Sequence, residues 1–217
     1  MGKGNSNKVV ILIISLFISL IVGAVVFAMC GYSPLSAYIA ILKGGLGSRS
    51  SIIISLSQTM IIAFMGLAYI TAIRAGICNI GLEGQMYVGA IAAAIAGVYI
   101  KGIPSFIHVP LVLLMAIVAA GLWGMLVAVL KIRFGANEII TAIMLNFIAE
   151  NFTSYLVSGP MKVEGTVAQS ERVQDSAHLV NLVDTPQLSS GILIFFFLTI
   201  IIFLIMKYTR FGFEVRV

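Results

Sequence analysis

Six side chains that can hydrogen-bond or carry charge lie within or beside long apolar stretches of this chain. Four are carboxamides and two are carboxylates. Such groups are costly in hydrocarbon, so in membrane proteins they normally face a water-filled cavity, a solute or a neighbouring helix. We predict that they line or shape a translocation path; the alternative is that they only hold helices together. The residues are Gln58, Asn79, Glu83, Gln85, Asn146 and Glu150.

Glu150 is the most telling of the six. Asn146, Glu150, Thr153 and Ser154 recur at helical spacing and therefore share one face of a helix. Glu150 lies about 18 Å along that helix from Glu138, past the middle of a bilayer. A carboxylate at that depth must turn toward a cavity or a partner. We favour a role in lining a lumen over a structural role in which Asn146 and Glu150 hydrogen-bond to neighbouring helices.

The stretch Arg74–Met86 combines three glycines with Asn79, Glu83 and Gln85. Each glycine weakens a continuous helix by about 1 kcal/mol relative to alanine. Irregular backbone survives at membrane depth only when protein buries it or when it lines water. A short apolar run beside a glycine-broken polar stretch is typical of a discontinuous helix near a translocation path. The pattern predicts a discontinuous helix around residues 76–86, with a tight cytoplasmic hairpin as an equally weighted alternative.

No motif of a catalytic or nucleotide-binding site occurs in the sequence. It lacks a G-x-x-x-x-G-K-[ST] loop, an H-E-x-x-H pair and a G-x-S-x-G elbow. His108 and His178 fall in predicted outer loops, and Cys30 and Cys78 are too few and too far apart for a metal site or a disulfide framework. The sequence therefore favours a protein that is not an enzyme, holds no cofactor and needs a separate energy source for uphill transport.

The composition places these groups in a membrane protein. Of 217 residues, 60% are hydrophobic and 10% charged, and the mean hydropathy is +1.12. Soluble domains carry about 25% charged residues, so lipid must solvate much of this surface. These values exclude a soluble enzyme, a disordered chain and a disulfide-stapled secreted module. The net charge of +5 serves to orient the chain in the bilayer and requires no nucleic acid.

Six apolar runs predict about six spanning helices, and therefore an all-α, polytopic transmembrane bundle. The first run is too long for a cleaved signal and is expected to stay as a helix. The third run is short unless it extends into the polar stretch before it. The runs are Val9–Met29, Ile52–Ile73, Met86–Ile100, Val109–Leu130, Asn137–Val157 and Leu188–Met206.

Local signals refine these boundaries. Ser33-Pro34 predicts a short surface helix, Pro110 is expected in the first turn of the fourth run, and Asn137 is expected as an N-cap. Small residues at every fourth position predict close packing of the third and fourth helices. They are Gly89, Ala93 and Gly97, and Ala120, Gly124 and Ala128.

The basic residues predict a cytoplasmic N-terminus, because Lys and Arg concentrate in cytoplasmic loops. Alternating crossings place the outer connections at about residues 31–51 and 159–187, which form either a docking surface or a loose connector. Eight basic residues then fall inside and five outside. The inner set is Lys3, Lys8, Arg74, Lys131, Arg133, Lys207, Arg210 and Arg216; the outer set is Lys43, Arg49, Lys101, Lys162 and Arg172.

Three blocks resemble a known family. Arg74–Met86 (RAGICNIGLEGQM), followed by Gly89, resembles the signature of ABC-transporter permeases of the simple-sugar and nucleoside importer group. Gly135–Ala149 (GANEIITAIMLNFIA) resembles the second block of that family, and Tyr208–Val217 resembles the lead-in to its cytoplasmic coupling loop. Cys78 departs from the pattern, since a bulky apolar residue usually stands there. The match is closest to the nucleoside branch.

The resemblance implies the permease subunit of an ABC importer, a multi-pass protein of the cytoplasmic membrane. Its expected partners are a cytoplasmic ATPase that binds the ATP, a second permease subunit and an extracellular substrate-binding lipoprotein. Residues 1–217 are expected to form a single transmembrane domain, an N-terminal fragment that stops before the coupling segment. Neutral polar groups suit ribose hydroxyls and base edges, so nucleosides, or simple sugars, are the expected solutes.

The sequence leaves three alternatives to an ABC-importer permease. One is an ion-coupled secondary transporter that uses Glu83 or Glu150. Another is a permease for branched-chain amino acids, and the last is a membrane scaffold that transports nothing.

Overall fold

The structure is a computed structural model that describes residues 3–215, and most of them are helical. Two compact units divide the chain: one holds the chain up to Gln58 together with Val183–Leu188, and the other holds Thr59–Leu182 and the chain from Ser189. The α-helices confirm the predicted fold class. They are α1 (Lys3–Met29), α2 (Pro34–Leu46), α3 (Arg49–Arg74), α4 (Leu82–Tyr99), α5 (Ser105–Phe134), α6 (Glu138–Ser158), α7 (Gly191–Tyr208) and α8 (Arg210–Glu214); a 3₁₀ turn η1 (Asp175–Ala177) and a two-stranded sheet of β1 (Asn181–Val183) and β2 (Leu188–Ser189) complete the list.

The first unit contains α1, α2 and the start of α3. As predicted, α2 begins at Pro34 directly after Ser33, although the Ser33 side chain forms no capping bond. The Tyr38 hydroxyl donates to the Leu20 carbonyl over 2.6 Å, and its ring meets Phe27 edge to face at 5.6 Å. The short surface helix expected in residues 31–51 is therefore present and held to α1.

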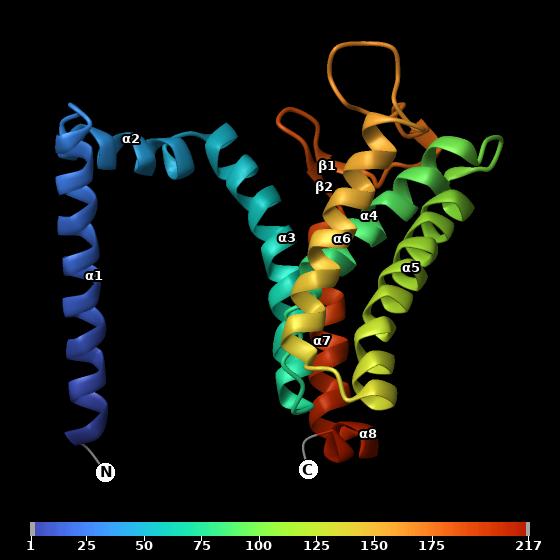
Figure 1. Cartoon of the computed structure of the whole chain (residues 1–217). Helices are drawn as coiled ribbons and strands as arrows, with labels where there is room; N and C mark the ends of the chain where they lie inside the picture. The colour runs from blue at the N-terminus through green and yellow to red at the C-terminus, as the bar shows by residue number, and fades with distance from the viewer. Residues whose placement is uncertain (1–2, 216–217) are drawn as a thin grey trace. The chain divides into compact units, whose positions relative to one another are not determined.

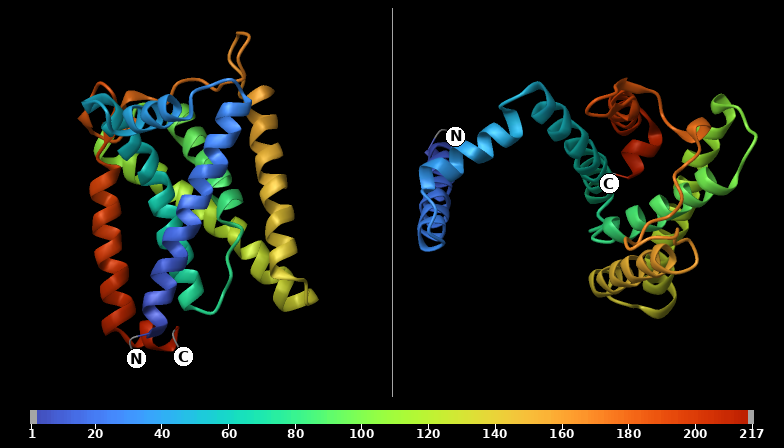
Figure 2. Two further views of the ribbon diagram at one scale, coloured as in Figure 1. Left: turned by 90° about the vertical axis from the view of Figure 1, so that its left-hand side faces the viewer. Right: turned by 90° about the horizontal axis from the view of Figure 1, so that it is seen from above.

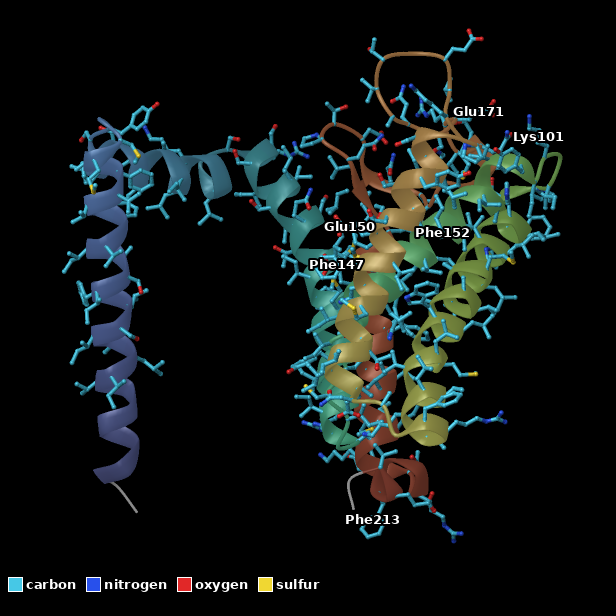
Figure 3. All side chains as sticks on the ribbon, in the orientation of Figure 1. Lys101, Phe147, Glu150, Phe152, Glu171 and Phe213 are labelled. Atoms are coloured by element: carbon cyan, nitrogen blue, oxygen red, sulfur yellow. The ribbon has the colours of Figure 1, made fainter. Side chains whose placement is uncertain are left out.

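In the second unit the helices run alternately between two ends (Figures 1 and 2). Helices α3, α5 and α7 finish at one end, which we call the basic end because Arg74, Lys131 and Lys207 lie in their last turns. Helices α4 and α6 finish at the opposite end, where Lys101 and Glu171 lie (Figure 3). Arg216, another residue expected on the inner side, falls outside the described residues.

Five helices among residues 3–215 are long and apolar enough to cross a membrane: α1, α3, α5, α6 and α7. They correspond to five of the six predicted runs. The remaining run became α4, which has 18 residues and starts at Leu82 instead of Met86. The first turn of α4 comes from the polar stretch before Met86, because the apolar run alone is short for a crossing.

The chain breaks between α3 and α4 because glycine ends α3. Gly76 adopts φ +72°, a left-handed conformation that favours glycine. Its N–H donates to the Ile73 carbonyl, and the Ile77 N–H donates to the Ala72 carbonyl, both over 3.0 Å. This is the Schellman arrangement of a helix C-terminus. Residues 77–80 then run without helical structure until α4 begins at Leu82 (Figure 2).

Small residues allow α4 to pack closely against α5 and α6. A methyl group on Gly89 would lie 3.3 Å from the Ala116 carbonyl oxygen and 3.4 Å from the Ala120 side chain. On α6, Ala142 and Ala149 are 1% and 0% exposed. The close approach predicted from Gly89 and Ala120 is confirmed, and dispersion between nearby backbones stabilises these helix pairs.

Two boundary predictions were wrong. Helix α5 starts at Ser105 after an extended Pro104, so Pro110 lies inside the helix and not in its first turn. Helix α7 starts at Gly191, because Leu188 pairs in β2. Asn137 is an N-cap as predicted: its side-chain oxygen accepts from the Ile139 and Ile140 N–H groups.

His108 lies in α5 and not in an outer loop, which corrects the sequence prediction. Its side chain is fully buried, with Nδ1 at 2.8 Å from Ser176 Oγ and Nε2 at 3.4 Å from the Ala96 carbonyl oxygen. A carbonyl oxygen only accepts, so Nε2 donates to Ala96, and Nδ1 forms the second hydrogen bond with the Ser176 hydroxyl. Gln174 adds bonds to the Gly97 and Val98 carbonyls. Together these contacts hold residues 173–177 against the last turn of α4 and the first turn of α5.

Candidate functional site

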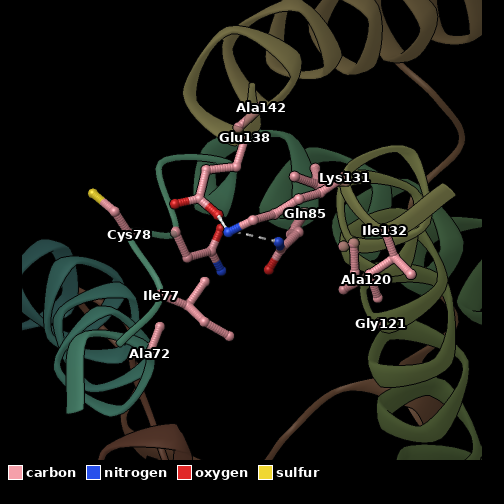
Figure 4. Close-up of a pocket in the computed structure, with 14 residues that line it drawn as sticks. Ala72, Ile77, Cys78, Gln85, Ala120, Gly121, Lys131, Ile132, Glu138 and Ala142 are labelled. Carbon is pink, nitrogen blue, oxygen red and sulfur yellow. Dashed lines mark hydrogen bonds and ion pairs between the residues drawn. The ribbon is translucent and has the colours of Figure 1, made fainter. Parts of the chain in front are cut away.

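A cavity of about 600 Å³ opens beside the break between α3 and α4. We call it the amide cavity, because Asn79 and Gln85 project into it from the broken segment and from α4. Lys131 and Glu138 reach it from the α5–α6 turn (Figure 4). Its other walls are apolar: Ala72, Ile77, Cys78, Ala120, Gly121, Gly124, Val127, Ala128, Ile132 and Ala142.

The polar groups of the amide cavity are paired with one another. Asn79 Oδ1 accepts from the Gly81 N–H over 3.1 Å and from Gln85 Nε2 over 3.4 Å. Lys131 Nζ donates to Glu138 Oε2, with the two side chains 53% and 24% exposed. A mostly apolar wall with a few oriented polar groups is the usual lining of a small-molecule passage.

Asn146 on α6 holds the broken backbone in place. Its Oδ1 accepts from the Gly84 N–H over 2.9 Å, and its Nδ2 donates to the Ile80 carbonyl over 3.0 Å. Asn146 stands about 12 Å along α6 from Glu138, so α4 begins well inside the second unit. The break predicted around residues 76–86 appears as the non-helical residues 77–80, after which α4 begins at Leu82.

Gly84 makes this contact possible. A methyl group on Gly84 would lie 2.8 Å from Asn146 Oδ1 and 3.1 Å from both Asn146 Cα and Trp123 Nε1. Any side chain there would push α6 away from α4. Trp123 Nε1 is the one buried side-chain nitrogen or oxygen in the described part of the chain without a hydrogen-bond partner.

A second hollow, of about 490 Å³, lies between α4 and α6. We call it the Glu150 groove. Glu150 stands about midway along α6, on the same helix as Phe147 and Phe152 (Figure 3). The groove is lined by Tyr87, Ala90, Ile91, Ala94, Glu150, Thr153, Ser154 and Val157.

The structure brings together some of the six predicted residues and separates others. Asn79, Gln85 and Asn146 gather around the break, and Glu150 lines the separate groove. Glu83 is exposed on the first turn of α4 and lines neither hollow. Gln58 is exposed at the end of the first unit.

Sequence reasoning missed three residues of these hollows. In the sequence Lys131 indicates only membrane orientation and Glu138 carries no functional signal, yet they form an ion pair in the amide cavity. Opposite charges at the two ends of a tight helix–helix turn could have indicated this pair. Tyr87, in the Glu150 groove, stands three residues after Gly84 and carried no signal of its own. Residues 3–215 contain no group of three or more His, Cys, Asp or Glu side chains that could hold a metal ion.

Relatives of known description match the chain over most of its length. The guanosine ABC transporter permease protein NupP of Bacillus subtilis is 34% identical over 208 residues, which cover 94% of this chain and 59% of the relative. The nucleoside ABC transporter permease protein NupB of Lactococcus lactis is 26% identical over 223 residues, covering 99% and 61%. The glucose ABC transporter permease protein TsgB13 of Haloferax volcanii is 31% identical over 214 residues, covering 94% and 56%.

The chain spans about 60% of the length of these curated relatives, and no solved structure matches it. A family model described as the permease component of branched-chain amino acid transport systems matches residues 51–217. That range includes all three blocks that carried the resemblance, and the resemblance to ABC-importer permeases is confirmed. The chain therefore belongs to the branched-chain amino acid transport system / permease component family.

Proposed function

We propose that this chain forms the membrane-spanning part of a permease subunit in an ABC importer, and that the importer carries nucleosides or, less favoured, simple sugars into the cell. Relatives named as guanosine, nucleoside and glucose permeases support the solute class. The permease provides an alternating path, while a separate ATPase subunit supplies the energy. Residues 1–217 act as one transmembrane domain and perform no catalysis of their own.

The interrupted crossing before α4 is the observation that carries this proposal. Backbone groups without helical partners are tolerated at membrane depth only next to protein or water. Here Asn146 satisfies two of them, and the amide cavity lies beside the segment. Asn79 and Gln85 line the path directly, Asn146 shapes it, and Glu150 lines its continuation along α6. Gln58 and Glu83 are proposed to border the path in the assembled transporter.

The proposed arrangement has a cytoplasmic N-terminus in the cell membrane. The basic end of the second unit, with Arg74, Lys131 and Lys207, then faces the cytoplasm, as the positive-inside rule requires. The ATPase subunit docks on that side. A second permease subunit completes the path, and an extracellular binding lipoprotein delivers the solute to the outer segment 159–182.

Uptake measurements test the function. A strain that lacks the intact gene should lose uptake of labelled guanosine, and a plasmid copy should restore it. A third strain should carry the intact permease with an ATPase subunit whose phosphate-binding lysine has been changed to alanine. Uptake should be lost there as well, while the permease stays at its normal level in the membrane.

Three results would contradict the proposal. Guanosine uptake that ignores the ATPase variant but collapses with an ionophore would indicate an ion-coupled transporter. Loss of leucine uptake alone would indicate a branched-chain amino acid permease. Unchanged flux of guanosine, glucose and leucine after deletion would indicate a scaffold.

A further inference from the structure

The polar groups of the Glu150 groove differ from those of the amide cavity, because most of them have no partner. The Glu150 carboxylate and the hydroxyls of Tyr87 and Ser154 form no hydrogen bond with any residue from 3 to 215. Thr153 already donates its hydroxyl hydrogen to the Ala149 and Glu150 carbonyls, over 2.9 Å each. In contrast, Asn79, Gln85 and Asn146 all bond within the chain.

An unpartnered carboxylate at this depth requires a partner from outside the described chain. Glu150 lies about 18 Å along α6 from its start at Glu138, far from either end of a bilayer-spanning helix. Leaving the charge toward lipid costs several kcal/mol. The groove therefore holds water, a solute or a group of another subunit for at least part of the working cycle.

The chemistry of the groove favours a solute with two adjacent hydroxyls. An ionised carboxylate only accepts hydrogen bonds and offers two oxygens, which match the paired O–H donors of a vicinal diol. Acidic side chains hold ribose hydroxyls in this way in dinucleotide-binding folds. A hard cation is a poorer match, because such ions take six or more oxygen ligands and the groove offers one carboxylate and three hydroxyls.

The remaining walls fit the rest of such a solute. Tyr87 offers a flat aromatic surface, and Ala90, Ala94 and Ile91 form an apolar floor. A base or the C–H face of a sugar ring packs well on surfaces of this kind. The volume of about 490 Å³ lies within the range of small-molecule sites, about 300–1,000 Å³.

We propose that the Glu150 groove binds the vicinal diol of a ribonucleoside or a sugar as it passes through the membrane. Glu150 accepts hydrogen bonds from both hydroxyls, Ser154 supplies a further polar contact, and Tyr87 packs against the base or ring. This inference rests on the proposed function and adds to it a specificity-determining residue within the permease itself.

The test compares initial uptake rates of guanosine and 2′,3′-dideoxyguanosine by the whole importer, with intact Glu150 and with Glu150→Gln. Within each variant the ratio of the two rates cancels the amount of permease in the membrane. Comparing the two ratios also cancels the selectivity of the binding protein, which is the same in both strains. Loss of a charged hydrogen bond should lower the guanosine preference on the order of tenfold. Glucose with 2-deoxyglucose forms the parallel arm for a sugar solute.

Asp184→Asn is the matched control, because it makes the same carboxylate-to-amide change in the exposed turn between β1 and β2. Its ratio should equal that of the unmodified importer. If Glu150→Gln slows both guanosine and the dideoxy compound equally, the diol assignment is wrong while the proposed function stands. If the unmodified importer takes up neither guanosine nor glucose, both the function and the assignment are overturned.

Discussion

The side-chain amide of Asn146 combines two tasks that no carboxylate or aliphatic group can combine. Its nitrogen donates to the Ile80 carbonyl, and its oxygen accepts from the Gly84 N–H. The two bonds satisfy backbone groups on both sides of the start of α4. At the scale of the single residue, this amide stabilises the non-helical backbone before α4 in a membrane.

Replacing Asn146 with alanine should therefore destabilise the protein. Two backbone groups would lose their partners, at about 1–3 kcal/mol each when buried. The thermal midpoint of the purified importer should fall clearly below that of the unmodified protein. Asn151→Ala is the matched control, because Asn151 bonds only to the Phe147 carbonyl in its own helix. Equal midpoints for the two variants would show that Asn146 does not hold the break.

Gly84→Ala tests the same contact from the other side. The added methyl group would stand 2.8 Å from Asn146 Oδ1, so α4 and α6 would have to separate. Overpacking of this kind costs about 1–3 kcal/mol. Gly66→Ala in α3 adds a methyl group where no atom lies within 4 Å, and should leave the thermal midpoint unchanged or raise it. A Gly84→Ala protein as stable as Gly66→Ala would contradict the packing described here.

The sequence indicates which polar side chains lie in or beside the two hollows but not how they pair. Polar groups in apolar surroundings identified Asn79, Gln85, Asn146 and Glu150 without any coordinates. Spacing along α6 places Asn146 and Glu150 on one face, yet Asn146 bonds the backbone of α4 and Glu150 lines the Glu150 groove. That difference depends on how α4 packs against α6, and a contact across 62 residues of chain has no local signature.

At the scale of elements, the outer segment is held more firmly than its composition indicates. A long polar loop was expected to be either a docking surface or a loose connector. The structure fastens part of it through buried His108, which joins Ser176 to the Ala96 carbonyl. The sequence misplaces His108 because Pro110 suits the first turn of a helix that begins at Val109, whereas α5 begins at Ser105, directly after Pro104.

His108→Ala should release this segment. Ser176 would lose its partner in a buried site, at about 1–3 kcal/mol, and a cavity would add to the loss. Trypsin should then cut after Arg172, next to the pinned residues, on the order of tenfold faster where cleavage follows the open population. His178→Ala serves as the control, since exposed His178 contacts only the nearby Val173 carbonyl. Equal cleavage rates in the two variants would mean that His108 does not fasten the segment.

At the scale of the whole molecule, charge and crossing direction agree. The basic end of the second unit carries Arg74, Lys131 and Lys207 in the last turns of three helices. Alternation of the helices could be predicted from hydropathy alone. The third crossing was the exception, because its apolar part is too short and its non-helical part carries no hydropathy signal.

Reporter fusions test the orientation. A reporter that is active only outside the cytoplasm should be active when fused at Gly165 and inactive when fused at Lys131. A cytoplasmic reporter at the same two positions should give the opposite pattern and serves as the control. Activity of the external reporter at Lys131 would reverse the proposed topology.

The two hydrogen bonds between Asn146 and the backbone at the start of α4 also have a consequence for the synthesis of the protein. Asn146 is synthesised 62 residues after Gly84, which takes roughly 3–12 s at ordinary rates of translation. During that interval the open backbone before α4 has no partner and cannot rest against lipid. We therefore expect the segment before α4 to stay in contact with water or protein until α6 has been synthesised.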